Sequence, residues 1–341
     1  MKVRTLALGV LASVLMPATA QAEAVVLKVA HFLPPASPAH TKFIVPWCER
    51  IKAESKGGLE CQIYPAMQLG GTPPQLLTQV RDGVADVVWT LPGYTAGRFP
   101  VSEGFELPFI TAGREASSRA LWDLSQSRAS QEFAGMKPIA TWVTGPYALH
   151  LRDHDVSTLE GLAGLKVRAP SRLGTKLLAA LGATPVGMPV PQMAESLSKR
   201  VIDGALLPWE VLPATKVHEL TRFHVEVSGD RALLAATMIF VMNEKKYDSL
   251  PIDLKKVIDA NSGRETSAWV SAQFVEPDED GRKRAQERGN AVRALAADEV
   301  AKWQAAAGPV TAGWVEEITA KGMDGRSLHE EARALIDKYS K

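Results

Sequence analysis

Short apolar runs alternate with amphipathic segments along this chain, and that alternation restricts the folds it can adopt. Runs typical of buried strands occupy residues 25–30, 59–64 and 87–89. The segments between them, residues 42–56 and 74–82, have helical patterns, and each is followed by a glycine that can close a helix. Strands that alternate with helices in this way favour a largely parallel α/β sheet.

A second series of strand patterns indicates that this arrangement occurs twice. The series begins near Thr141 and continues at residues 165–167 and 205–207. The sequence therefore predicts two α/β units. The last part of the chain has helical patterns over residues 254–283, 291–303 and 328–339.

The first 22 residues have the pattern of a secretory signal peptide. Lys2 and Arg4 precede an apolar run over residues 6–16, and residues 20–22 (Ala-Gln-Ala) provide a small-x-small cleavage site. The apolar run is too short to be a transmembrane anchor, and no later stretch is long enough to span a bilayer. We therefore expect a soluble protein that is exported to the periplasm.

The net charge argues against one class of partner. The whole chain carries a formal charge of +1, and loss of Lys2 and Arg4 with the signal peptide lowers it to −1. A nearly neutral protein has no overall field that attracts nucleic acid or an acidic membrane. We expect neither of these as a partner.

The two cysteines allow two interpretations. Cys48 lies on or beside the apolar face of a predicted helix, and Cys61 lies in the strand pattern that follows. An oxidising compartment permits a disulfide between them. Two buried free thiols are an equal alternative, and the sequence does not decide between them.

Arg168 is the residue with the clearest functional pattern. It ends a short apolar strand in the segment Leu-Lys-Val-Arg-Ala-Pro, and Pro170 pushes the preceding residue toward an extended conformation. Open α/β sheets bind their ligands at the carboxyl ends of strands. The planar guanidinium suits a carboxylate, because two parallel charge-assisted hydrogen bonds fix both charge and orientation. A surface arginine paired with a nearby acid is the plainer alternative for this segment alone.

Five segments together resemble one known family. In order along the chain they are LKVAHF, YPAMQLGG, QVRDGVADV, GLKVRAP and VIDGALLPWE. They are similar to segments of the extracytoplasmic solute-binding proteins of TRAP transporters, the DctP-type receptors, and the resemblance covers nearly the whole mature chain. It implies two α/β lobes around a cleft, a hinge of crossing strands and a long helix that spans both lobes. We assign residues 23–146 with about 234–272 to lobe I, and residues 147–233 with about 273–341 to lobe II.

The resemblance also implies a function and one anchoring residue. Members of the family capture organic anions in the periplasm and deliver them to a membrane permease that is driven by an ion gradient; a monomer is the default state. Arg168 matches the carboxylate-anchoring arginine of the family. A second arginine of many members corresponds to Ala148 here, and His150 or Arg152 is the candidate replacement.

Other candidate ligand-binding residues follow from their positions at strand ends. Trp209 and Glu210 lie in the segment that faces the ligand in the family, and Trp209 can stack on a flat ligand. Glu210 can accept a ligand hydroxyl or, as the minor alternative, help to hold a metal as in some relatives that bind 2-oxo acids with calcium; no full set of oxygen ligands is evident. Trp89 and Phe240 are expected either at the cleft or, more simply, in the core. The remaining candidates are His31, Phe32, Tyr94 and Arg98.

These residues favour a monocarboxylate with an aromatic or branched body. A C4-dicarboxylate or a sugar acid is the alternative, and a dicarboxylate needs a second cation from Arg98 or Arg152. A ligand sensor for a membrane kinase is an alternative of another class, which the sequence leaves open. We predict no enzyme, cofactor or metal site, because the seven histidines are scattered and no HExxH, GxSxG or phosphate-binding pattern occurs.

Overall fold

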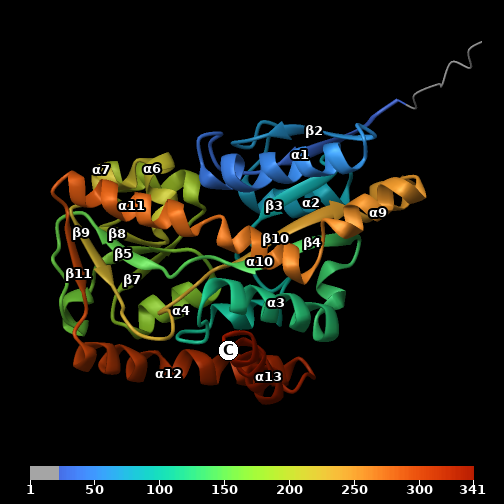
Figure 1. Cartoon of the computed structure of the whole chain (residues 1–341). Coiled ribbons are helices and arrows are strands. Elements are labelled where there is room, and N and C mark those ends of the chain that lie inside the picture. Colours follow the sequence, from blue (N-terminus) through green and yellow to red (C-terminus); the bar gives the residue numbers. More distant parts are fainter. Residues whose placement is uncertain (1–22) are drawn as a thin grey trace, which may run out of the picture.

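Two separate β-sheets organise residues 23–341, the part of the chain that the computed structural model describes (Figure 1). The predicted signal peptide, residues 1–22, lies outside the described residues. The first sheet has the strand order β2-β1-β3-β10-β4 and defines lobe I. Its strands are β1 (Val25–Ala30), β2 (Leu59–Tyr64), β3 (Val87–Thr90), β4 (Met136–Val143) and β10 (Thr237–Asn243).

The second sheet has the order β11-β9-β5-β8-β6-β7 and defines lobe II. Its strands are β5 (Ala148–Leu151), β6 (Lys166–Ala169), β7 (Thr184–Gly187), β8 (Gly204–Leu207), β9 (Phe223–Glu226) and β11 (Ala291–Ala294). Two strand-rich units with helices between the strands confirm the predicted two-unit α/β organisation.

Helices cover the faces of both sheets (Figure 1). Lobe I has α1 (Val45–Glu54), α2 (Leu76–Arg81), α3 (Arg114–Arg128), α8 (Glu244–Ser249), α9 (Ile252–Ala260) and α10 (Arg264–Ala272). Lobe II has α4 (Arg172–Ala180), α5 (Met193–Ser198), α6 (Leu212–Thr215), α7 (Val217–Leu220) and α11 (Val275–Glu287). Most of these helices bury an apolar face; in α1, for example, Trp47, Cys48 and Ile51 are buried, whereas the short α8 has no buried residue.

The sheets are not wholly parallel, and the exceptions mark the hinge. β10 runs antiparallel to β3 and β4, and β5 runs antiparallel to β8 and β9. The chain reaches each of these two strands from the other lobe, so each enters its new sheet in the opposite direction. Local strand patterns carry no information about this direction, which explains why the sequence predicted largely parallel sheets.

The two crossing segments lie side by side and hydrogen-bond to each other. The N–H of Thr144 donates to the carbonyl of Ala236 at 3.0 Å, and the N–H of Tyr147 donates to the carbonyl of Leu234 at 3.0 Å. These bonds join the β4–β5 connection to the β9–β10 connection. The pair of segments is the hinge between the lobes.

The C-terminal helices brace both lobes from below in the view of Figure 1. α12 (Ala297–Ala320) packs on α4 of lobe II, and its Trp314 donates from Nε1 to the carbonyl of Pro100 in lobe I at 3.1 Å. α13 (Gly325–Tyr339) packs on α3 of lobe I, although the sequence-based division placed it with lobe II.

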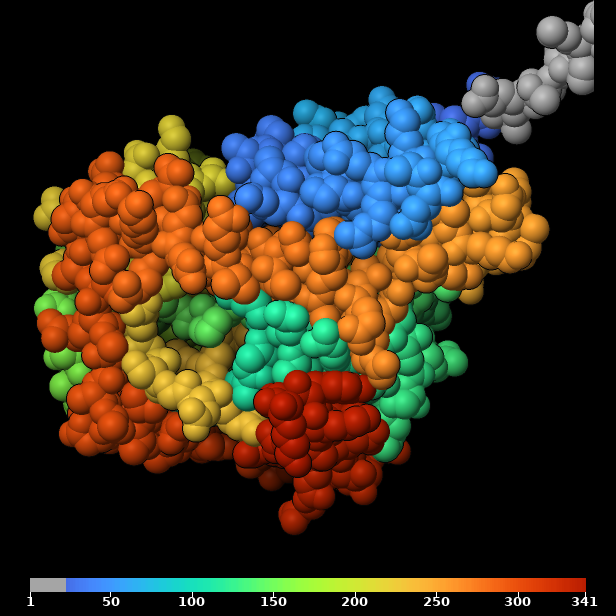
Figure 2. Space-filling model, viewed as in Figure 1, coloured from blue at the N-terminus to red at the C-terminus, as the bar shows by residue number. Residues whose placement is uncertain are grey.

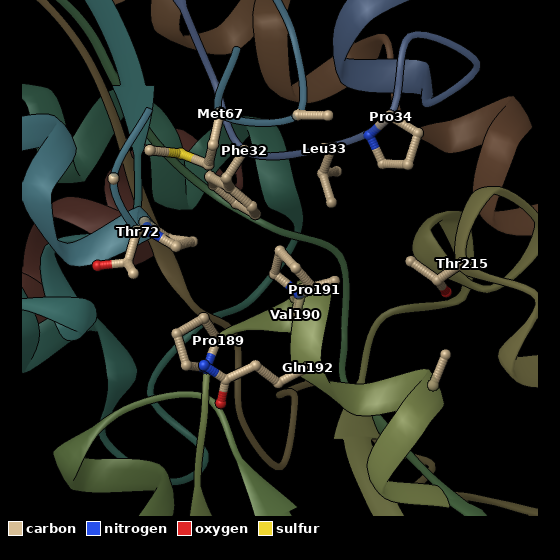
Figure 3. Close-up of a pocket in the computed structure, with 14 residues that line it drawn as sticks. Phe32, Leu33, Pro34, Met67, Thr72, Pro189, Val190, Pro191, Gln192 and Thr215 are labelled. Carbon is tan, nitrogen blue, oxygen red and sulfur yellow. The ribbon is translucent and has the colours of Figure 1, made fainter. Parts of the chain in front are cut away.

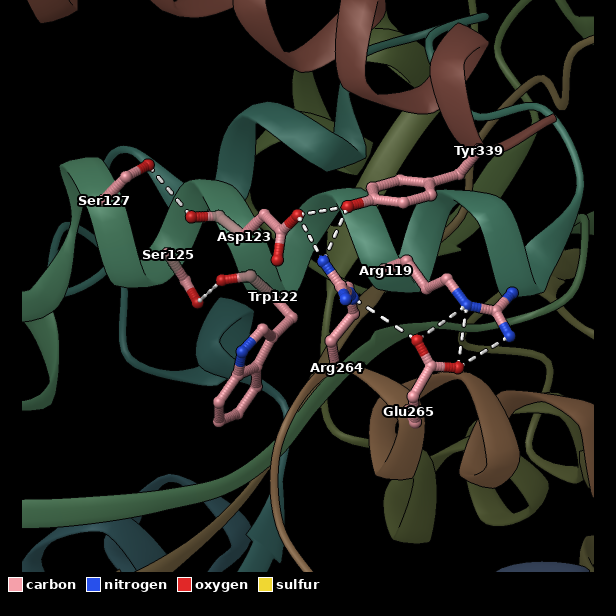
Figure 4. Close-up of polar contacts among 8 residues, drawn as sticks. All are labelled: Arg119, Trp122, Asp123, Ser125, Ser127, Arg264, Glu265 and Tyr339. Carbon is pink, nitrogen blue, oxygen red and sulfur yellow. Dashed lines mark hydrogen bonds and ion pairs between the residues drawn. The ribbon is translucent and has the colours of Figure 1, made fainter. Parts of the chain in front are cut away.

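A polar cluster fixes α13 in this position (Figure 4). Arg264 of α10 donates to the hydroxyl of Tyr339 at 3.0 Å and pairs with Asp123 of α3 at 3.4 Å. Tyr339 also donates to Asp123. Three helices from distant parts of the sequence are therefore tied together.

One predicted helix begins later than expected, and the two cysteines are paired. Residues 291–294, predicted as the start of a helix, form the edge strand β11 beside β9, and the helix begins at Ala297. Cys48 and Cys61 form a disulfide, with Cα atoms 5.8 Å apart, that joins α1 to β2. Within residues 23–341, no helix is both long and apolar enough to cross a membrane.

Candidate ligand-binding site

Arg168 lies at the carboxyl end of β6 with its side chain fully buried. Its Nε donates to the carbonyl of Met188 at 2.9 Å, and its Nη1 donates to the carbonyl of Leu206 at 3.1 Å. Its Nη2 has no hydrogen-bond partner in the part of the chain that the structure describes. The two backbone carbonyls therefore fix the plane of the guanidinium and leave one amino group available.

Within residues 23–341, the charge of Arg168 has no counter-ion. Among the described residues no carboxylate lies within ion-pair distance of it, whereas nearby Arg172 pairs with both Glu103 and Glu317. A buried charge without a partner is unfavourable unless an anion accompanies it. The site is thus built for a negatively charged ligand.

Tyr94 connects the two lobes next to this arginine. It ends the short helix η3 (Pro92–Tyr94) of lobe I, and its hydroxyl accepts a hydrogen bond of 3.1 Å from the N–H of Val190 in lobe II. Burial raises the pKa of Tyr94, and the neighbouring Arg168 guanidinium opposes that shift. Tyr94 is therefore a neutral phenol that lies between Arg168 and the cleft wall.

Aromatic rings from lobe I form a wall beside Tyr94. Phe32 stacks on Trp89 with ring centroids 4.7 Å apart and meets Tyr94 edge-on at 5.5 Å. His31 lies 5.9 Å from Trp89 and shares a 3.0 Å hydrogen bond with His40. Burial, with a smaller effect of His40, lowers the pKa of His31 to about 3, so its ring is neutral at physiological pH.

Trp209 provides an aromatic surface in lobe II. It follows β8, and its Nε1 donates to Glu226 at 3.0 Å. The ring of His150 meets it edge-on at 4.8 Å, and the ring of His224 lies 4.9 Å away. Burial lowers the pKa of His150 well below its usual value, so His150 acts as a neutral support behind Trp209 rather than as a replacement cation.

Glu210 follows Trp209 and is also buried. Its N–H donates to Oδ1 of Asp278 at 2.8 Å, while its Oε2 has no hydrogen-bond partner. Burial and the Asp278 carboxylate raise the pKa of Glu210 well above its usual value. Asp278 itself forms a buried ion pair with Arg114 of lobe I.

Tyr147 is a site residue that the sequence analysis did not identify. It lies in the hinge, and burial raises its pKa well above the usual value; the charge of Arg168 opposes this shift, whereas Glu210, Tyr94 and Glu106 add to it. Its position directly before β5, in the segment Gly-Pro-Tyr-Ala, is the one sequence signal that marks it.

Three other candidates have partners elsewhere. Arg98 donates to the carbonyl of Ala134 at 3.4 Å. Arg152 donates to the carbonyl of Leu197 at 3.1 Å and to Asp153 at 2.7 Å. Phe240 packs edge-on against Phe43 and Trp47 in the core of lobe I. The structure does not bring these residues to Arg168.

Two cavities are lined in part by the aromatic residues named above. One, of about 460 Å³, lies between the lobes and is largely apolar: Phe32, Leu33 and Pro34 face Pro189, Val190 and Pro191 (Figure 3). The other, of about 370 Å³, lies on the hinge side and includes Tyr147 and Trp209 in its lining. Figure 2 shows it as the hollow between α11 (orange), the segment after β9 (yellow) and α3 (teal). Residues 23–341 contain no group of three or more His, Cys, Asp or Glu side chains that could hold a metal ion.

Two α/β lobes that close over a buried, unpaired arginine define a two-lobed solute-binding protein. Residues 29–317 match the model of a family described as bacterial extracellular solute-binding protein, family 7 (DctP). The chain belongs to this family, which confirms the predicted resemblance to TRAP solute receptors. The members of the family bind solutes and are not enzymes.

Solved structures and a curated relative agree with this assignment. The chain is 46% identical to a TRAP solute-binding protein from Rhodoferax ferrireducens in complex with copurified benzoate, with a TM-score of 0.91 and coverage of 93% of this chain and 98% of that one. It is 43% identical to a marine metagenome TRAP protein specific for aromatic acids, crystallised with 3-hydroxybenzoate, with a TM-score of 0.92 and coverage of 93% and 99%. It is 24% identical to the C4-dicarboxylate-binding protein DctP of Rhodobacter capsulatus, over 91% of this chain and 92% of that one.

Proposed function

We propose that this receptor captures an aromatic monocarboxylate in the periplasm and delivers it to the membrane permease of a TRAP transporter. Arg168 anchors the carboxylate, and closure of the lobes encloses the ligand. The observation that carries this proposal is the buried Arg168 guanidinium, which has a free Nη2 and no acidic partner among the described residues. A charge-assisted hydrogen bond to it contributes on the order of 1.5–3 kcal/mol.

The surroundings of Arg168 support an aromatic body for the ligand. Phe32, Trp89 and Tyr94 supply rings from lobe I, and Trp209 supplies one from lobe II. Offset or edge-on contacts between rings add to the gain from burial. Two of the solved relatives, 46% and 43% identical, are in complex with benzoate and 3-hydroxybenzoate, which are acids of the same class.

A C4-dicarboxylate has less support. Its second carboxylate needs a second cation, and the two candidates, Arg98 and Arg152, already donate to backbone carbonyls away from Arg168. Neutral His31 and His150 do not supply a charge. A ligand with one carboxylate leaves no charge uncompensated.

Closure strengthens the anchoring bond because it removes water. In the low-dielectric interior an arginine–carboxylate pair is stronger than at the surface. The hydrogen bond between Tyr94 of lobe I and Val190 of lobe II joins the two lobes in the closed state. The permease then receives a ligand that is released when this contact opens.

A calorimetric comparison of carboxylates tests the proposal. Mature protein, freed of copurified ligand by unfolding and refolding, is titrated with benzoate, 3-hydroxybenzoate, phenylacetate, succinate and glucuronate. We expect the three aromatic acids to bind at least tenfold more tightly than the other two. Tight binding of succinate or glucuronate, with none of the aromatic acids, would overturn the proposal.

A further inference from the structure

The carboxyl group of Glu210 has no structural role that explains its burial. Glu210 is 6% exposed, and its Oε2 has no hydrogen-bond partner among the described residues. The nearby base, Arg114, is already paired with Asp278. An unpaired polar group in a protein interior costs free energy, and an apolar side chain of the same size would avoid that cost.

Glu210 and Arg168 lie at the same edge of the second sheet. β6, which carries Arg168, and β8, which leads into Glu210, are adjacent and parallel, with Arg168 opposite Ala205. The carbonyl of Leu206 in β8 accepts a hydrogen bond from Arg168, so the two strand ends are in contact. Both side chains are close enough to the hinge residue Tyr147 to affect its pKa.

The protonation state of the Glu210 carboxyl determines which groups of a ligand it can bind. Burial and the carboxylate of Asp278 both favour the neutral acid. A neutral carboxyl has an O–H donor as well as acceptor oxygens, so it can pair with a hydroxyl group in either direction. It does not repel a ligand that carries a carboxylate at its other end.

We propose that Glu210 recognises a hydroxyl group on the ring of the ligand, so that this receptor prefers ring-hydroxylated aromatic acids to ring-alkylated ones. The inference rests on the proposed function, because it requires an aromatic acid anchored at Arg168. The hydroxyl supplies the partner that Oε2 lacks. A methyl group of similar size leaves Oε2 unpaired in the complex.

A ligand series on the wild-type protein tests this without altering the fold. Calorimetry compares 3- and 4-hydroxybenzoate with 3- and 4-methylbenzoate, and with benzoate as the reference. We expect at least one hydroxybenzoate to bind about tenfold more tightly than its methyl counterpart, as pairing of one buried polar group implies. Equal affinities within each pair would overturn the inference, while failure of all five acids to bind would instead overturn the proposed function.

Two variants of Glu210 test whether this residue causes the preference for a ring hydroxyl over a methyl group. E210Q keeps the shape, the donor and the acceptor of the neutral acid, so it should retain the preference. E210L removes both hydrogen-bonding functions, so the ratio of its affinities for a hydroxybenzoate and the matching methylbenzoate should fall to about one, whatever its affinity for benzoate. An unchanged preference in E210L, or a loss in E210Q as large as that in E210L, would contradict recognition by the neutral carboxyl; thermal unfolding of each ligand-free variant shows whether it is folded.

Discussion

Tyr94 and Val190 lie in different lobes and are joined by a hydrogen bond across the cleft. The N–H of Val190 donates to the Tyr94 hydroxyl at 3.1 Å, next to Arg168, whose Nε is bound to the carbonyl of Met188 in the same segment of lobe II. One segment of lobe II therefore orients the ligand-anchoring residue and also meets the other lobe. This arrangement couples ligand capture to closure.

Replacing Tyr94 with Phe should accelerate ligand release. The change removes the acceptor for the N–H of Val190 and leaves that donor without its partner in the closed state. A neutral hydrogen bond of this kind contributes about 0.5–1.5 kcal/mol, which corresponds to a rise of roughly 2- to 12-fold in the dissociation rate. Stopped-flow measurement of the change in tryptophan fluorescence tests this, and Tyr64→Phe, at the end of β2, is the matched control. Equal dissociation rates for wild type and Tyr94→Phe would show that the bond does not hold the cleft closed.

Gly93→Ala should hinder closure directly. A Cβ atom at Gly93 of lobe I would lie 2.6 Å from the Cβ of Ser171 in lobe II, closer than two carbon atoms can approach. The open state has no such conflict, so we expect weaker ligand binding with little change in the thermal stability of the ligand-free protein. Small-angle scattering at saturating ligand should show a larger radius of gyration than for wild type. Gly308→Ala in α12, where a Cβ meets nothing within 4 Å, is the control; superimposable scattering curves for all three proteins would count against a closure contact at Gly93.

Arg168→Met should weaken ligand binding without lowering the stability of the ligand-free protein. Loss of the guanidinium removes the charge that balances the ligand carboxylate, so affinity should fall well over tenfold, in line with about 1.5–3 kcal/mol for a charge-assisted bond. The ligand-free protein should be as stable as wild type or more so, because an unpaired buried charge is replaced by an apolar side chain.

Arg172→Met is the contrasting variant for this test. Arg172 pairs with Glu103 and Glu317, so its loss should lower the unfolding temperature and leave affinity largely intact. Calorimetry and thermal unfolding are measured on both variants. Retained ligand affinity in Arg168→Met would exclude Arg168 as the anchor.

The features predicted most accurately from the sequence are those that depend on residues close together along the chain. β1 and β2 were predicted with the bounds observed, because the run of apolar residues in β1 and the alternating pattern after Gly57 and Gly58 in β2 are local signals. The strand-end position of Arg168 is also a local property, but its prediction as the carboxylate anchor came from the resemblance to the family. By contrast, β11 was predicted as helix: its four residues become a strand only through pairing with β9, a long-range contact.

The site could be predicted only in part for the same reason. Glu210 is held by Asp278 of α11, and the neutral state of His150 depends on its burial, with a smaller effect of His224 of β9; both partners lie far along the chain. Tyr147 was missed because its role arises where two crossing segments meet. The pairing of Cys48 with Cys61 was left open, since their separation in space is fixed by the packing of α1 on β2.

Removal of the disulfide should lower stability without affecting binding. Cys48 and Cys61 are 13 residues apart, and a closed loop of about that size is worth roughly 3 kcal/mol in the chain-entropy model. The bond joins α1 to β2, away from Arg168. Urea unfolding of the double variant Cys48→Ala, Cys61→Ala should show this loss, and calorimetry should show unchanged affinity. A large loss of affinity in a folded double variant would mean that the disulfide shapes the cleft.

Because His150 and His224 form a buried pair behind Trp209, the free energy of unfolding should decrease as the pH falls below neutrality. Nε2 of His150 donates to the carbonyl of Leu207 at 3.0 Å, so its Nδ1 must accept the 2.7 Å hydrogen bond from Nδ1 of His224. Asn290 then donates to Nε2 of His224 at 3.0 Å, and both rings are neutral. Burial, together with a smaller effect of His218, lowers the pKa of His224 from 6.5 to about 4.

The direction of this pH dependence is set by whether the folded or the unfolded protein binds the proton. Between pH 6.5 and about 4 the unfolded chain protonates His224 and the folded protein does not, so stability decreases as pH falls through this window and is unaffected by this group above it. From pH 7 to pH 5 the loss from His224 is about 2 kcal/mol. His224→Gln retains a donor and an acceptor but does not titrate, so urea unfolding should show a weaker pH dependence in the variant, and the comparison cancels the contributions of other groups. Parallel pH profiles for the two proteins would mean that His224 is protonated in the folded state, and the hydrogen-bond directions assigned to the pair would then be wrong.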